Sequence, residues 1–442
     1  MAAPPYPQQA PRAPQKRDPE ATKKTLGWVF YFILMAIGGF FLFGLFIIMP
    51  LIEDGGESLT SMGIGALLAL PLLCLYIWVP WIIDRYDPEP LWALIAVLAW
   101  GGITACGFSA VINTFIGSAA SAIGGKSFGQ VVGACFSAPL VEEFWKGLAV
   151  FWMFYFRKRD FDGIVDGIIY GAFVALGFAA VENIIYYARA ADAEMMHGQD
   201  SALAGTVFIR GILAPWGHPL YTAMTGIGFG LARETEKGWV RWMAPIGGYF
   251  CGVFLHFVWN LAATISNVLV LVMLPLWFLF LLAFFGLVIW CVRRKGKIIG
   301  DHLRDEVLMG NLTLQEYQMI ISPIGRMKAT FSFGGAAGRK FVDAAARLAL
   351  SKWHTGRATR GRKMTISADF IVPLRQELHQ LRADVARALG RQVPQPQAWR
   401  PGMPSPFPQP AQPYQQQRPP QNPYGGGGPP PAGGYGWGPP GG

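Results

Sequence analysis

Charged side chains are scarce in this chain. Asp, Glu, Lys and Arg together make up 14% of its 442 residues, the same share as Phe, Trp and Tyr. Because soluble domains carry about 25% charged residues, the composition excludes an ordinary soluble protein and predicts a polytopic membrane protein.

Several short motifs are also missing. The five Cys residues lie in apolar segments without the close pairs of a metal knuckle or a redox motif, so we expect them to be inert. The zinc motif His-Glu-x-x-His does not occur. The apolar segment after Lys24 is too long for the core of a signal peptide and lacks a small-residue cleavage site, so we interpret it as an uncleaved first membrane helix.

Apolar segments long enough to span a bilayer follow one another along the chain. We predict eight membrane helices, at residues 27–52, 60–83, 91–117, 128–156, 163–188, 204–232, 242–264 and 268–292. The loops between them alternate between basic, as at Arg157-Lys158-Arg159, and acidic, as at Glu53-Asp54. The positive-inside rule therefore predicts a multi-pass protein of the cytoplasmic membrane with both termini in the cytosol. We assign the net charge of +10 to topology and anionic lipid headgroups, and expect no nucleic-acid partner.

The predicted fold class is all-α, a polytopic helical membrane bundle. We divide the chain into a disordered tail (1–24), a membrane domain (25–295), a cytosolic helical region (296–392) and a disordered tail rich in Pro, Gln and Gly (393–442). In the cytosolic region, small or apolar residues recur at a heptad spacing over fewer repeats than a coiled coil needs. An amphipathic helix is the favoured interpretation of these residues, which are Ile371, Leu374, Leu378, Leu381, Val385 and Ala388.

Polar residues interrupt four of the predicted membrane helices at one common depth. Each lies about 15 residues, or about 22 Å along a helix, from the charge that should mark the cytosolic end of its helix. Burying one such acid costs roughly 2.5–3.5 kcal/mol, so coincident depths indicate a functional site between helices. These residues are Glu142-Glu143, Glu182, His218 and His256.

The fourth segment carries two adjacent acids and one lysine. Adjacent residues on a helix diverge by about 100°, so Glu142 and Glu143 cannot serve one role at one point. Lys146 follows Glu142 at the favourable four-residue spacing. A buried ion pair that orders the bundle is the structural interpretation, but two acids and one lysine leave an acid uncompensated, which favours a catalytic role.

The fifth segment places Glu182-Asn183 after Gly163, Gly167 and Gly171, a spacing that permits close helix approach. Glu182 is a candidate ligand, a candidate orienter of a ligand, or a structural acid bonded to a neighbouring helix; the sequence leaves these alternatives open.

Two histidines follow on later segments. Pro215 and Pro219 bracket His218, which predicts a helix break that lines a polar cavity. His256 and Asn260 share one helix face, where they could donate to an oxyanion, or His256 could bind a metal while Asn260 supports substrate. His256 bonded to Asn260 only for structure is the alternative.

Taken in order, these motifs resemble the PrsW family of bacterial intramembrane proteases. The resemblance covers roughly residues 60–295 and rests on four motifs and on the loop Asp84–Pro90. The Glu-Glu and His-x-x-x-Asn pattern is also similar to the CAAX prenyl protease superfamily. The resemblance implies peptide-bond hydrolysis within the membrane, as the first cut in a single-span protein such as an anti-sigma factor, on its extracytoplasmic side. The motifs are Glu142-Glu143-x-x-Lys146, Glu182-Asn183-x-x-Tyr186, His218 and His256-x-x-x-Asn260.

These observations predict an intramembrane endopeptidase acting on a single-span membrane protein in the lipid bilayer. Glu182, His218 and His256 form a plausible zinc set with an open fourth position, but a glutamate that activates water without metal remains an alternative. A proton-coupled transporter and a non-catalytic membrane scaffold are the competing functions. The predicted catalytic residues are Glu142, Glu143, His218, His256 and Asn260, supported by Lys146, Glu182 and Asn183.

Overall fold

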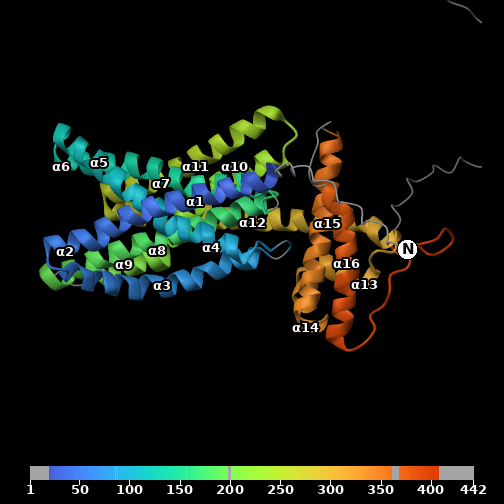
Figure 1. Ribbon diagram of the computed structural model, residues 1–442. Coiled ribbons are helices and arrows are strands. Elements are labelled where there is room, and N and C mark those ends of the chain that lie inside the picture. Colours follow the sequence, from blue (N-terminus) through green and yellow to red (C-terminus); the bar gives the residue numbers. More distant parts are fainter. Residues whose placement is uncertain are drawn as a thin grey trace, which may run out of the picture. The chain divides into compact units, whose positions relative to one another are not determined.

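The computed structural model describes residues 19–84, 86, 88–158, 160–197, 201–360 and 368–407. All regular structure within these residues is helical, which confirms the all-α prediction (Figure 1). Arg85, Asp87 and most of both predicted tails lie outside the described residues. The first helix begins at Pro19, within the segment predicted as the N-terminal tail.

Helices joined by short turns make up the membrane bundle, and π-helical segments (η) interrupt several of them. In chain order they are α1 (Pro19–Phe43), η1 (Gly44–Ile48), α2 (Met49–Glu53), α3 (Glu57–Ile83), α4 (Leu91–Ala99), η2 (Trp100–Ala105), α5 (Cys106–Gly124), α6 (Lys126–Val131), η3 (Val132–Ser137), α7 (Ala138–Phe156), α8 (Ile164–His197), α9 (Ala202–Val207), η4 (Phe208–Leu213), α10 (Gly217–Glu234), α11 (Gly238–Ile265) and α12 (Asn267–Leu308).

Six helices of the described residues are long and apolar enough to cross a membrane. The other two predicted segments are also helical, but 128–156 carries three charged residues and 204–232 is interrupted. The helical membrane bundle is therefore confirmed, and the number of eight spans stays a prediction. The six helices are Thr22–Glu53, Glu57–Ile83, Leu91–Gly124, Ile164–Met195, Gly238–Ile265 and Val268–Leu308.

Helix α8 forms the centre of the bundle. In its most apolar stretch 89% of the residues are buried, whereas only 6% are buried in the corresponding stretches of the first and last spans. Glycines let other helices approach its backbone: a Cβ added at Gly167 would lie 2.1 Å from the carbonyl oxygen of Gly226 on α10. One added at Gly171 would lie 2.9 Å from that of Thr222. The close approach expected at these glycines is confirmed, and it brings α8 and α10 together near the polar residues.

The predicted helix break before His218 is present. Helix η4 ends at Leu213, α10 begins at Gly217, and the residues between are not helical. Pro215 lies within this break and Pro219 in the first turn of α10, where their missing N–H groups interrupt no regular helix interior. His218 therefore starts a helix, with its side chain near the centre of the bundle.

The region after residue 296, which the sequence places in the cytosol by prediction, is helical. Helix α12 runs without interruption past Lys295, so the predicted boundary at residue 296 falls inside a helix and stays a prediction. The stripe residues Leu374, Leu378, Leu381 and Val385 are buried, as an amphipathic helix requires. The helices after α12 are α13 (Leu314–Ile321), α14 (Pro323–Ser332), α15 (Ala336–Arg360) and α16 (Ala368–Leu389).

Candidate active site

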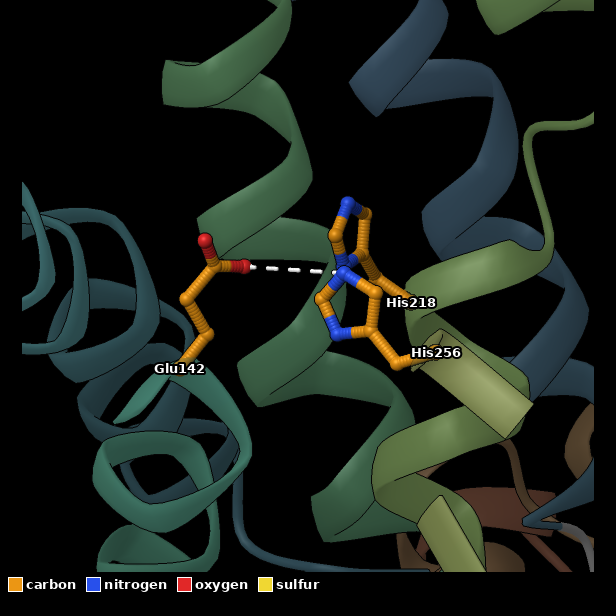
Figure 2. Close-up of side chains that lie close together, drawn as sticks. All are labelled: Glu142, His218 and His256. Carbon is orange, nitrogen blue, oxygen red and sulfur yellow. Dashed lines mark ion pairs between the residues drawn. The ribbon is translucent and has the colours of Figure 1, made fainter. Parts of the chain in front are cut away.

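Side chains from helices α7, α10 and α11 meet at one point inside the bundle. Figure 2 shows Glu142, His218 and His256 directed toward one another, with an ion pair drawn between Glu142 and His256. One ligand atom from each of the three lies within 4.8 Å of the others. The polar residues that the sequence placed at one depth are thus brought together, and their depth in a bilayer stays a prediction.

Glu143 is fully occupied by hydrogen-bond donors. Its Oε1 accepts from Lys146 Nζ at 2.5 Å and lies 3.1 Å from His256 Nδ1. Its Oε2 accepts from the hydroxyl of Thr222 at 2.8 Å. The Glu143 and Lys146 side chains are completely buried. With both oxygens engaged, Glu143 is suited to holding its neighbours in place.

Glu142 differs in that only one of its two carboxylate oxygens accepts a hydrogen bond from the described residues. Its Oε1 accepts from the Asn113 side-chain amide at 3.3 Å, and Ser137 orients that amide by donating to its Oδ1 at 2.7 Å. The buried Oε2 has no hydrogen-bond partner among the described residues. It lies 3.9 Å from His256 Nε2 and 4.0 Å from Lys146 Nζ. Glu142 therefore has the carboxylate oxygen that is open to a reactant.

Each histidine bonds a carboxylate through one ring nitrogen and turns the other inward. His256 Nδ1 lies against Glu143, and His218 Nε2 lies 2.7 Å from Glu182 Oε2. An ionised carboxylate only accepts, so those two nitrogens carry the protons and the opposite nitrogens keep their lone pairs. The inward Nδ1 of His218 lies 3.1 Å from Lys146 Nζ, which donates to it. Two imidazole lone pairs are therefore directed to the interior: that of His256 Nε2 lies close to Glu142, and that of His218 Nδ1 accepts from Lys146.

Glu182 lies behind His218. The same Oε2 that accepts from His218 also accepts from Arg210 Nη2, and Arg210 Nε donates to Asn183 Oδ1 at 2.9 Å. The sequence prediction did not include Arg210, although a lone arginine inside an apolar segment itself indicates a functional site. Three carboxylates, those of Glu142, Glu143 and Glu182, thus face two permanent cations. One acid is therefore left without a permanent cation. The sequence predicted such an excess from Glu142, Glu143 and Lys146 alone, whereas the structure adds Glu182 and Arg210 to the count.

Two further residues were absent from the predicted site. Thr222 follows His218 at four residues' distance on α10, which places both on one face. Asn113 is a polar residue in the apolar helix α5. The four-residue spacing could have identified Thr222, and the polar residue in an apolar helix could have identified Asn113. Asn260, in contrast, donates its amide to the carbonyl oxygen of Ala134 at 2.8 Å. That bond joins α11 to η3, and a catalytic role for Asn260 stays a prediction.

The donor set fits a zinc ion. A carboxylate and two imidazoles are common zinc ligands, and zinc-bound histidines usually donate their second N–H to a carboxylate, as both histidines do here. The unpartnered Oε2 of Glu142 supplies the third ligand atom. The set formed in space is Glu142, His218 and His256. Glu182, the acid that the sequence grouped with the histidines as a zinc ligand, instead accepts a hydrogen bond from Nε2 of His218.

Carboxylates and imidazoles buried between membrane helices supply what a hydrolase that works inside the bilayer needs: a base for water and groups that orient it. The fold and the site together therefore define a polytopic membrane protein with the chemistry of an intramembrane hydrolase.

Comparisons with known proteins give the family. Residues 89–289 match the family model described as PrsW family intramembrane metalloprotease, and this range contains every residue of the site. Over these residues the match supports a PrsW family intramembrane protease, as the motifs indicated. No solved structure matches the chain.

Relatives named Protease PrsW support the assignment. The one from Geobacillus kaustophilus is 27% identical over 196 residues, which cover 40% of this chain and 79% of the relative. The one from Bacillus subtilis is 27% identical over 216 residues, or 48% of this chain and 85% of the relative. The one from Oceanobacillus iheyensis is 29% identical over 177 residues, or 40% and 70%.

Proposed function

We propose that this protease hydrolyses a peptide bond of a single-span membrane protein, such as an anti-sigma factor, near the extracytoplasmic face, and that Glu142 is the general base. The observation that carries the proposal is the buried Oε2 of Glu142, which has no hydrogen-bond partner among the described residues. The alternation of basic and acidic loops supports a cytosolic position for both termini.

The geometry supports a reaction in which Glu142 activates water. Its Oε2 and the Nε2 of His256 are two acceptors 3.9 Å apart, and a water molecule between them can donate a proton to each. As water attacks the scissile carbonyl, Glu142 takes its proton and then returns it to the leaving amine.

The negative charge that develops on the scissile carbonyl oxygen needs a hydrogen-bond donor nearby. The ammonium of Lys146, 4.0 Å from Glu142 Oε2, is suited to stabilise it in this buried site. Asn260, predicted for the same task, would first have to release the carbonyl oxygen of Ala134.

Glu142, His218 and His256 are the residues that would hold zinc. A bound ion would polarise water and lower its pKa toward neutrality. Glu143 and Glu182 would then fix the two histidines from behind.

The test compares the wild type with E142Q in lipid nanodiscs, on a panel of single-span membrane proteins as probe substrates. The amide keeps the shape but cannot take a proton, so we expect a loss of cleavage of about 10²–10⁴-fold. The control is E57Q, the same change at an exposed acid in the first turn of α3, which should cleave as the wild type does.

Metal analysis distinguishes a zinc-dependent mechanism from one in which Glu142 activates water without metal. About one zinc per chain, lost in E142Q and removed together with activity by a chelator, would establish the metal-dependent form. A metal-free, chelator-resistant enzyme would establish the glutamate form. Cleavage by E142Q at the wild-type rate would contradict both. Intact transport or partner binding without any proteolysis in the wild type would favour the transporter or the scaffold.

A further inference from the structure

Arg210 contacts all three named residues of the motif Glu182-Asn183-x-x-Tyr186. Its Nη2 donates to Glu182, and its Nε donates to Asn183 Oδ1 at 2.9 Å. The centre of its guanidinium lies 3.8 Å from the centroid of the Tyr186 ring. One side chain from η4 thus contacts three residues on α8.

The chemistry of these contacts is specific to arginine. A guanidinium is planar, donates in fixed directions and stacks on aromatic rings, so it can hold a carboxylate, an amide oxygen and a ring at once. A lysine has the charge, but its single ammonium cannot make all three contacts in that geometry.

Arg210 also joins the two sides of the helix break. It lies on η4 before the break, whereas His218 lies on α10 after it. Glu182 Oε2 accepts from both Arg210 Nη2 and His218 Nε2, so one oxygen of α8 connects the two sides. No regular helix fixes the angle between η4 and α10, because the residues between Leu213 and Gly217 are not helical. The Arg210–Glu182–His218 bridge supplies that constraint.

We propose that Arg210 is a positioning residue. It fixes the rotamer of Glu182, which then accepts from His218 Nε2 and so holds the Nδ1 lone pair of His218 toward Lys146 and Glu142. The consequence for cleavage depends on the function proposed above. The consequence for the His218 ring does not, which keeps the two separately testable.

The direct test is the ¹⁵N NMR spectrum of histidine-labelled full-length protein in nanodiscs, with His218 assigned by substitution. In the wild type we expect one tautomer, protonated at Nε2. In R210M, Glu182 loses its anchor and His218 its fixed acceptor, so the signal should change to a mixture of both tautomers. R210K keeps a cation beside Glu182 and should restore most of the wild-type signal.

Cleavage of the probe substrates gives the second measurement. We expect a decrease of about 10–100-fold for R210M, typical of residues that orient a reactive group from behind, and a smaller one for R210K. The matched control is R233K, at an arginine of α10 that donates to the carbonyl oxygen of Phe161 at 3.0 Å, away from the site. It should change neither measurement.

Each outcome decides the proposal. A wild-type tautomer together with wild-type cleavage in R210M would overturn it. If R210M fails to fold, R210K decides. A folded R210K that gives the wild-type spectrum but cleaves as slowly as an inactive variant would also overturn the proposal, because the loss of cleavage would then not depend on the His218 ring. If the wild type cleaves nothing while R210M still changes the His218 tautomer, the proposed function fails and the positioning role stands.

Discussion

Glu143 and Lys146 form an ion pair of 2.5 Å in which both side chains are completely buried. They lie three residues apart on α7, a spacing that places them on one face of the helix. Lys146 also donates to His218, so this pair connects α7 to α10 as well as to its own helix. Removing one member of such a pair leaves a charge without compensation in a dry interior.

The first prediction concerns the stability of this pair. K146M should lower the free energy of unfolding by about 3–5 kcal/mol, because the neighbouring carboxylates lose their cation. Denaturant unfolding in detergent measures the change. In the double variant K146M/E143Q the stranded charge is also removed, so it should unfold less readily than K146M alone. Equal stability of K146M and the wild type would show that the pair does not hold the bundle together.

The second prediction concerns topology. In a background with the exposed Cys74 and Cys251 replaced by Ser, we introduce a single Cys at Ser201 or at Lys237, two exposed positions between helices. The positive-inside rule predicts that a membrane-impermeant thiol reagent added to intact cells labels S201C and not K237C. The opposite labelling pattern would invert the orientation and move the site toward the cytosol.

The third prediction concerns the position of the cut. A site about 22 Å from the cytosolic boundary of a ~30 Å hydrocarbon layer lies only about 8 Å from the outer boundary. The substrate then needs to unwind only its outer one or two turns, so we expect new termini at or just outside the extracytoplasmic end of its span. Pro or Gly introduced near that end should increase cutting, because a helix keeps its backbone bonded. Mass spectrometry of the products locates the termini, and cuts in the cytosolic half would refute the estimated depth.

The fourth prediction concerns pH and helix α15, which lies in the region predicted to be cytosolic. Burial, together with the nearby Arg357 and Arg233, lowers the pKa of His354 to about 4. Its Nε2 has no hydrogen-bond partner among the described residues. The unfolded chain takes up a proton near pH 6.5 and the folded chain only near pH 4, so stability falls as the pH decreases through this window, by about 3 kcal/mol at most.

The variant H354Q removes this titration. Its thermal unfolding midpoint should decrease less than that of the wild type between pH 7 and about pH 4.5, whereas the two proteins should respond alike above pH 7. Parallel curves over the whole range would mean that His354 does not contribute to the acid sensitivity.

The sequence by itself determined that this is a helical membrane protein and which helices carry its polar site. A carboxylate or imidazole in an apolar helix is costly, so Glu142, Glu182, His218 and His256 were recognisable without coordinates. The break near His218 followed from the two prolines, since proline cannot continue a helix interior. These features depend on residue type and local spacing, which the sequence contains.

Only the tertiary structure decided which of these groups are free to react. Glu142 and Glu143 are adjacent and chemically identical, yet Glu143 is saturated by donors from α7, α10 and α11, whereas Glu142 keeps an unpartnered oxygen. Likewise Asn260 is bound to a backbone carbonyl of η3, and Arg210 holds Glu182 from another helix. The reason is physical: the rotation of each helix about its axis, set by packing against its neighbours, decides which donors reach which lone pairs.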